Sequence, residues 1–78
     1  MAAFFNIWAS ADAQILPRLL EYFAQRDLLT SQVSARINGD EMTVLIVTDA
    51  LSRFQAEVIS EKMQQNVLVS RVTLTLAD

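Results

Sequence analysis

The sequence predicts an α+β fold in which a four-stranded antiparallel sheet carries two helices on one face. Segments with the periodicity of strand, helix, strand, strand, helix and strand follow one another along the 78 residues. An Asn-Gly pair between the two middle strands is typical of a tight hairpin. This order is that of the ferredoxin-like βαββαβ fold, in which right-handed crossovers give the spatial strand order 4-1-3-2. We expect one domain over residues 1–78.

The first strand is predicted at residues 3–9. Phe5 and Ile7 point to one face, and Phe4, Asn6 and Trp8 point to the other. Apolar side chains on both faces are typical of a central strand that is covered on both sides.

The first helix is predicted at residues 13–26, with Ser10 and Asp12 as candidate N-caps. Its apolar residues recur with a period of 3.6 and form one arc: Ile15, Leu16, Leu19, Leu20 and Phe23. Pro17 lacks a backbone N–H, so we expect an irregular first turn and regular helix from residue 16 or 17.

Residues 30–38 alternate in polarity, which predicts a half-exposed strand with Val33, Ala35 and Ile37 on its inner face. Gly39, the one glycine of the chain, can adopt the positive φ of a hairpin turn. Residues 41–48 are almost entirely apolar and are predicted to form a second central strand.

The second helix is predicted to run to about residue 65, with Ser52 and Gln55 as a capping box. We expect Leu51, Phe54 and Val58 to form its inner stripe, from which Ile59 and Met63 deviate. The last strand is predicted at residues 67–76. Its two faces should be Leu68, Val72, Leu74 and Leu76 on one side, and Val67, Val69, Arg71, Thr73 and Thr75 on the other.

Composition restricts the function. The chain has no cysteine and no histidine, which removes thiolate chemistry and the commonest general base. We therefore expect no catalytic residues, no metal site and no cofactor. The net charge of −3, with scattered arginines, argues against nucleic-acid binding. No signal peptide or membrane-spanning apolar run is visible, so we expect a cytoplasmic protein without a membrane association.

The hydrophobic fraction of 53% is high for so short a chain and predicts a second buried surface, in a homodimer. The edge of the last strand could form this interface, and so could the sheet face that carries Phe4 and Trp8. Trp8 and the phenylalanines could also stack on RNA bases, but the third strand has no aromatic residue to complete such a platform.

Three groups of polar residues are candidate sites. Asp12 and Gln14 could bind an anion at the start of the first helix, or could simply cap it. Asp40 and Glu41 at the hairpin tip, and Glu57 and Glu61 on the second helix, are interpreted as solvated acids.

The chain resembles the ACT domains, and in particular the regulatory small subunits of acetolactate synthase. The resemblance covers nearly the whole chain and is carried by the stretches ILPRLLEYFAQRDL, QVSARI and NVLVSRVTLTL. It implies a non-catalytic regulatory domain that associates with a larger catalytic subunit and modulates an enzyme of amino-acid biosynthesis. The alternatives are a stand-alone sensor of a branched-chain amino acid and, from another class, a small enzyme of ferredoxin-like fold.

The resemblance also implies a place for an amino acid effector, at the turn formed by Ser10, Ala11, Asp12, Ala13, Gln14 and Ile15. The effector carboxylate would accept hydrogen bonds from backbone N–H groups near Ala13 and Gln14. In the family a glycine commonly stands where this chain has Gln14, and asparagines stand where it has Ala11 and Leu29. We therefore expect a weak or absent response to valine, leucine or isoleucine, and no restoration by Gln14→Gly alone.

Overall fold

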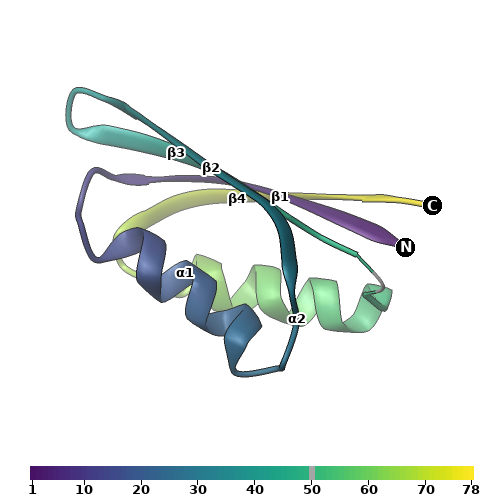
Figure 1. Cartoon of the computed structure of the whole chain (residues 1–78). Helices are drawn as coiled ribbons and strands as arrows, with labels where there is room; N and C mark the ends of the chain where they lie inside the picture. Colours follow the sequence, from purple (N-terminus) through teal and green to yellow (C-terminus); the bar gives the residue numbers. More distant parts are fainter. Residues whose placement is uncertain (50) are drawn as a thin grey trace.

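The chain folds into two layers, a sheet and a pair of helices that lie together on one of its faces (Figure 1). The structure is a computed structural model that describes residues 1–49 and 51–78. Its elements are, in chain order, β1 (Ala2–Ser10), α1 (Ile15–Ala24), β2 (Thr30–Asn38), β3 (Glu41–Thr48), α2 (Arg53–Gln64) and β4 (Val69–Ala77). The sheet is four-stranded and antiparallel, in the order β2-β3-β1-β4. The predicted fold class and strand order are confirmed.

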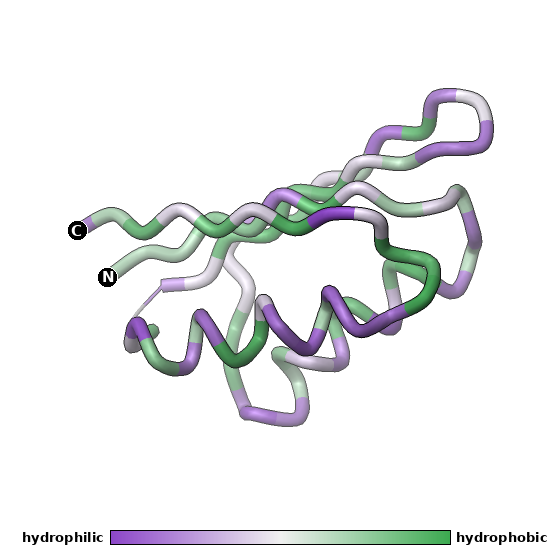
Figure 2. Tube along the Cα trace, turned by 180° about the vertical axis from the view of Figure 1, so that it is seen from behind, coloured by the Kyte–Doolittle hydropathy of each residue, from purple (hydrophilic) through white to green (hydrophobic). Residues whose placement is uncertain are grey.

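The core lies between the helices and the two central strands. Alternate residues of β1 are buried, and Phe5 and Ile7 stand opposite Ile46 and Val44 of β3. The ring of Phe5 meets the ring of Phe23 edge to face, with centroids 5.2 Å apart. The tube in Figure 2 is hydrophobic along the central strands and hydrophilic at the hairpin turn, which projects beyond the helices.

The predicted inner arc of α1 is confirmed. Ile15, Leu19 and Phe23 are buried, and Leu16 and Leu20 are half-buried. The helix begins at Ile15, so Pro17 lies in its first turn, where a missing N–H costs no helical hydrogen bond. The irregular first turn expected from Pro17 is therefore wrong: the helix is regular from Ile15, earlier than expected, and the turn at residues 13–14 precedes it.

The predicted inner stripe of α2 is wrong: Phe54 is 76% exposed and Val58 is only half-buried. Ile59 and Met63, which were expected to deviate from the stripe, are fully buried. The side chains that α2 buries are those of Ala56, Ile59, Ser60 and Met63. Leu51 is buried but precedes the helix, so helical spacing counted from Leu51 assigns the wrong residues to the buried face of α2. The capping box is confirmed: the Ser52 hydroxyl accepts a hydrogen bond from the Gln55 backbone N–H at 3.1 Å, and the Gln55 side chain accepts one from the Ser52 N–H.

The predicted faces of β4 are wrong at Val69, because a β-bulge interrupts the pairing of β4 with β1. Arg71 stands opposite Trp8, but the next partner, that of Ala9, is Val69. Ser70 is the extra residue, and its hydroxyl donates a hydrogen bond to the Trp8 carbonyl at 3.1 Å. The bulge turns Val69 to the helix side, where it packs against the core.

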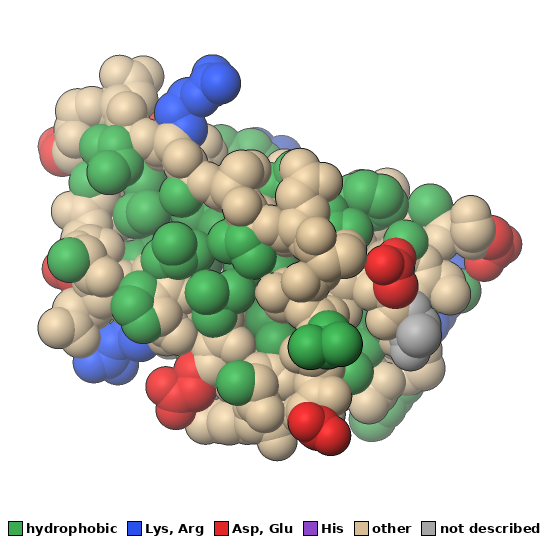
Figure 3. Space-filling view, viewed as in Figure 1, with side chains coloured by type: hydrophobic (Ala, Val, Ile, Leu, Met, Phe, Trp, Pro, Cys, Tyr) green, Lys and Arg blue, Asp and Glu red, His purple; other side chains and the backbone are tan. Residues whose placement is uncertain are grey.

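Strand β2 is more exposed than predicted. Its alternation is confirmed, since Val33, Ala35 and Ile37 stand opposite the buried Ile46, Val44 and Met42 of β3. The helices do not cover these residues: Val33 is 37% and Ile37 is 68% exposed. In Figure 3, hydrophobic side chains gather between α1 and the hairpin. We call the side chains of Val33, Ala35 and Ile37 the β2 strip.

Two further features complete the fold. Gly39 has φ of 65°, and the hairpin closes through Gly39 and Asp40, so glycine occupies the first central position of the turn. Within the described residues, neither helix has the length and apolar composition of a transmembrane segment.

Candidate functional site

The predicted effector turn links β1 to α1, and two backbone hydrogen bonds hold its first residues. The Ser10 N–H donates to the Leu68 carbonyl at 2.9 Å, and the Ala11 N–H donates to the Asp40 carbonyl at 2.8 Å. The turn is therefore fixed against the α2–β4 connection and against the hairpin. The side chains from Ser10 to Gln14 are exposed, but Ile15 is fully buried in the core. Ile15 thus anchors the turn and offers no surface to a ligand.

The carboxylate of Asp12 lies in this turn at the place where the carboxylate of an effector was expected. Its Oδ1 accepts a hydrogen bond from the Gln14 N–H at 2.8 Å, and its carbonyl accepts one from the Ile15 N–H at 3.1 Å. The helix has Gln14, not Asp12, at its N-cap, and no side chain caps it there. The N–H of Gln14, one of the groups predicted to receive an effector carboxylate, is therefore already bonded to a carboxylate of the chain itself.

A hollow of about 310 Å³ lies beside the turn, and sequence reasoning missed part of its lining. Asp12 and Gln14 line it together with Arg18 of α1 and with Asn66, Val67 and Leu68 from the α2–β4 connection. Arg18 follows Gln14 by four residues, so helical spacing could have indicated it. Asn66 is distant in sequence, and its Oδ1 accepts a hydrogen bond from the Leu68 N–H at 2.9 Å. No sequence signal predicts that this segment lies here.

Leu29, where the family commonly has an asparagine, follows α1 and so lies at the opposite end of this helix from the effector turn. It is 90% exposed and, with Leu28 and Thr30, lines a mainly apolar hollow of about 530 Å³. The hydroxyl of Thr48 donates to the Leu29 carbonyl at 2.6 Å and fixes the entry into β2. One chain therefore does not bring Leu29 to the turn, and only a second molecule could bring the two surfaces together.

The acids interpreted as solvated are exposed in the structure: Asp40, Glu41, Glu57 and Glu61. No group of three potential metal-ligating side chains occurs among the residues that the structure describes.

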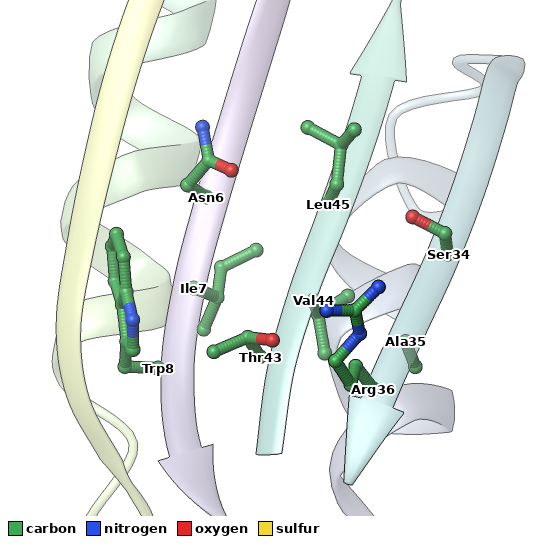
Figure 4. A pocket seen from close by; sticks show the side chains of 9 residues that line it. All are labelled: Asn6, Ile7, Trp8, Ser34, Ala35, Arg36, Thr43, Val44 and Leu45. Atoms are coloured by element: carbon green, nitrogen blue, oxygen red, sulfur yellow. The ribbon is translucent and has the colours of Figure 1, made fainter. Parts of the chain in front are cut away.

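Another hollow, of about 280 Å³, lies on the face of the sheet opposite the helices, which we call the open face. Figure 4 shows its lining side chains, which come from the three neighbouring strands β1, β3 and β2. Those that point to the open face are Asn6, Trp8, Ser34, Arg36, Thr43 and Leu45. The guanidinium carbon of Arg71, on β4, lies 4.8 Å from the centre of the Trp8 ring.

The comparisons with known proteins identify a family through one family model. The model of a family described as ACT-like domain matches residues 1–78. The ACT domain of GTP pyrophosphokinase from Chlorobium tepidum superposes with a TM-score of 0.82 at 9% identity, over 96% of this chain and 97% of that one. No curated protein matches the sequence.

Two further solved structures share the fold. An ACT domain protein from Streptococcus pneumoniae has a TM-score of 0.76 at 17% identity, over 96% of this chain and 88% of that one. The ligand-free regulatory subunit of aspartate kinase from Thermus thermophilus has a TM-score of 0.77 at 10% identity, over 95% of this chain and 50% of that one. At these identities the likeness establishes the fold alone.

Proposed function

We propose that this chain, which belongs to the ACT-like domain family, is a non-catalytic regulatory domain that pairs with a second copy and modulates an enzyme of amino-acid biosynthesis. The specific candidate is acetolactate synthase, whose small subunits the sequence resembles. The observation that carries the proposal is the family match over the whole chain. The absence of histidine and cysteine supports a non-catalytic role, because the commonest nucleophile–base pairs cannot be assembled.

The β2 strip supports pairing with a second copy. Strand β2 is an edge strand, so one row of its backbone N–H and C=O groups has no partner strand within the sheet. The β2 strip adds uncovered apolar side chains along the same strand. Antiparallel pairing of two β2 strands would satisfy the backbone groups and bring the strips of the two copies side by side. We therefore propose β2 for the interface, in place of the edge of the last strand and of the sheet face that carries Phe4 and Trp8.

The regulatory role is tested with the purified domain and the acetolactate synthase catalytic subunit of the same organism. We expect the domain to form a complex with the catalytic subunit and to change its turnover. Ile37→Lys should leave the monomer folded and weaken both effects if the active form is the dimer. Unchanged turnover at a saturating concentration of the domain, with no complex on sedimentation, would exclude this enzyme as the partner.

The second candidate function is that of a sensor for a branched-chain amino acid, and the hollow beside the effector turn favours it. This hollow is lined by both Asp12 and Arg18. An amino acid in it would place its ammonium group beside Asp12 and its carboxylate beside Arg18, because opposite charges complement each other there. This arrangement does not need the Gln14 N–H, which Asp12 already occupies.

Calorimetry with valine, leucine and isoleucine tests the sensor. Exposed charges give only weak attraction, so we expect millimolar or weaker binding for the wild type. Arg18→Gln should abolish any binding at this hollow, whereas Arg53→Gln on α2 should not change it. Micromolar binding that survives Arg18→Gln would refute the proposed arrangement.

A further inference from the structure

We infer that the open face of the sheet is a second ligand site, which binds a small monocarboxylate with a branched or cyclic apolar body. The site is the 280 Å³ hollow between Trp8 and Arg36, on the face of the sheet opposite the helices (Figure 4). It is separate from the β1–α1 turn, and it does not depend on the regulatory role proposed above.

The pairing of the strands explains why a hollow forms here. The register aligns Arg71, Trp8, Thr43 and Arg36 in one row across the four strands. Adjacent strands lie about 4.8 Å apart, so Trp8 and Arg36 stand about 10 Å from each other across the short side chain of Thr43. Two long side chains on either side of a short one leave a gap of about 280 Å³.

A second row closes the hollow along the strands. The register aligns Asn6, Leu45 and Ser34, with Leu45 in the middle. Leu45 gives this row an apolar centre, and the amide of Asn6 and the hydroxyl of Ser34 flank it. The lining therefore combines an aromatic wall, an apolar floor and polar groups that surround them.

The polar side chains of the hollow have capacity to spare for a ligand. Within the described residues, no side-chain hydrogen bond is formed by Asn6, Ser34, Arg36 or Thr43. Together they offer the guanidinium N–H groups, the amide NH₂ and two hydroxyls as donors, and few acceptors. A donor-rich site with one positive charge complements a carboxylate, which only accepts hydrogen bonds.

The distribution of charge also favours an anion. The chain carries a net charge of −3, yet the two rows contain arginines and no acid. Arg71 lies over the ring of Trp8 and adds a second positive charge on the far side of the indole. The nearest acid on the open face is Glu41, one row further toward the hairpin turn, between Ser10 and Asn38. Glu41 should weaken anion binding without blocking the hollow.

These features assign a position to each part of the ligand. The carboxylate accepts hydrogen bonds from Arg36 and Thr43, and the apolar body lies on Leu45 and against the Trp8 ring. An aliphatic or alicyclic body fits a wall of this kind through dispersion contacts. Because the hollow is open to solvent, we expect affinity in the millimolar range.

The single tryptophan of the chain lines this hollow, so its fluorescence reports on the site alone. The experiment titrates the full chain with cyclohexylacetate and, as the neutral match, with cyclohexylacetamide. We expect a saturable change in Trp8 emission with the acid and a response at least about tenfold weaker with the amide, since a charge-assisted hydrogen bond is lost.

Three variants separate this site from unspecific binding. Arg36→Gln should weaken binding about fivefold to tenfold, Glu41→Gln should tighten it, and Arg53→Gln on the helix layer should leave it unchanged. Amide resonances of the folded variants by NMR verify that each one keeps the structure. Equal responses to acid and amide, or a wild-type affinity for Arg36→Gln, would overturn the inference.

Discussion

Substitution of Ile37 by lysine tests whether the β2 strip is an interface. Complete burial of an isoleucine side chain stabilises by about 1.5–3 kcal/mol. Because 68% of Ile37 is exposed in the monomer, about two thirds of this amount, about 1–2 kcal/mol, remains available to a partner. A symmetric dimer contains the residue twice, so the variant should lose about 2–4 kcal/mol of association free energy.

This loss corresponds to an increase of the dimer dissociation constant by about 30-fold to 700-fold. Sedimentation equilibrium over a concentration series measures it directly. The unfolding midpoint of the monomer should change little, since exposed substitutions usually shift stability by less than about 0.5 kcal/mol. Lysine at the edge also opposes strand pairing through its charge.

Two matched variants give the controls. Ile37→Val keeps the β-branched shape and removes one methylene, so it should weaken the dimer by about 1 kcal/mol or less. Val67→Lys adds the same charge at a side chain that is 96% exposed in the α2–β4 connection, and should not affect the dimer. If the wild type is a monomer at micromolar concentration, or if Val67→Lys dissociates it equally, the reasoning from the β2 strip is refuted.

Three further predictions concern the fold itself and are measured by urea denaturation. Ile59→Ala should lower the free energy of unfolding by about 2–5 kcal/mol, because this side chain is fully buried, whereas Phe54→Ala should change it by less than about 0.5 kcal/mol. Similar losses for the two variants would contradict the assignment of Ile59 to the buried face of α2 and of Phe54 to the exposed face. Ser52→Ala should lower the free energy of unfolding by about 1 kcal/mol, because it removes the N-cap of α2. Ser52→Asp should retain most of the stability, because aspartate can also accept the N-cap hydrogen bond. Thr48→Val should lower the free energy of unfolding by about 1 kcal/mol, because valine keeps the shape of this fully buried side chain but leaves the Leu29 carbonyl without its donor.

The elements that sequence predicted well are those with local determinants. The Asn38-Gly39 pair placed the hairpin, and Ser52 with Gln55 placed the start of α2, because both signals act within four residues. The face of α1 was also predictable, since its arc of large apolar residues is continuous. These features need no knowledge of the rest of the chain.

The elements that sequence predicted poorly depend on contacts between distant segments. The bulge at Ser70 forms against the Trp8 carbonyl, so the reversal of Val69 has no local signal. The alternation of β2 identified its inner face correctly but could not indicate that α1 leaves Ile37 exposed. Periodicity assigns a side chain to a face, and only the packing of the layers decides whether that face is covered.

The same distinction applies to the candidate sites. The predicted N-caps Ser10 and Asp12 are wrong, because Gln14 holds the N-cap position of α1. The Asp12 carboxylate instead accepts a hydrogen bond from the Gln14 N–H, two residues further on, before the helix begins. Asn66 and the rows of the open face could not be assigned, since they require the topology and the register. Sequence therefore located the turn, whereas the surroundings that decide what it binds came from the structure.

Pairing at β2 and binding on the open face should influence each other. Alternate side chains of β2 point to opposite faces, so a β2–β2 interface covers Ile37 on the helix side and leaves Arg36 on the open face. Two joined sheets would bring both copies of Arg36 to one continuous surface, where their charges repel. A bound carboxylate neutralises this repulsion, so we expect cyclohexylacetate to tighten the dimer. Linkage requires that the gains in affinity at the two sites of the dimer multiply to the factor by which the acid tightens the dimer, so that each site gains the square root of that factor. Ile37→Lys should remove this enhancement and keep the binding of the monomer.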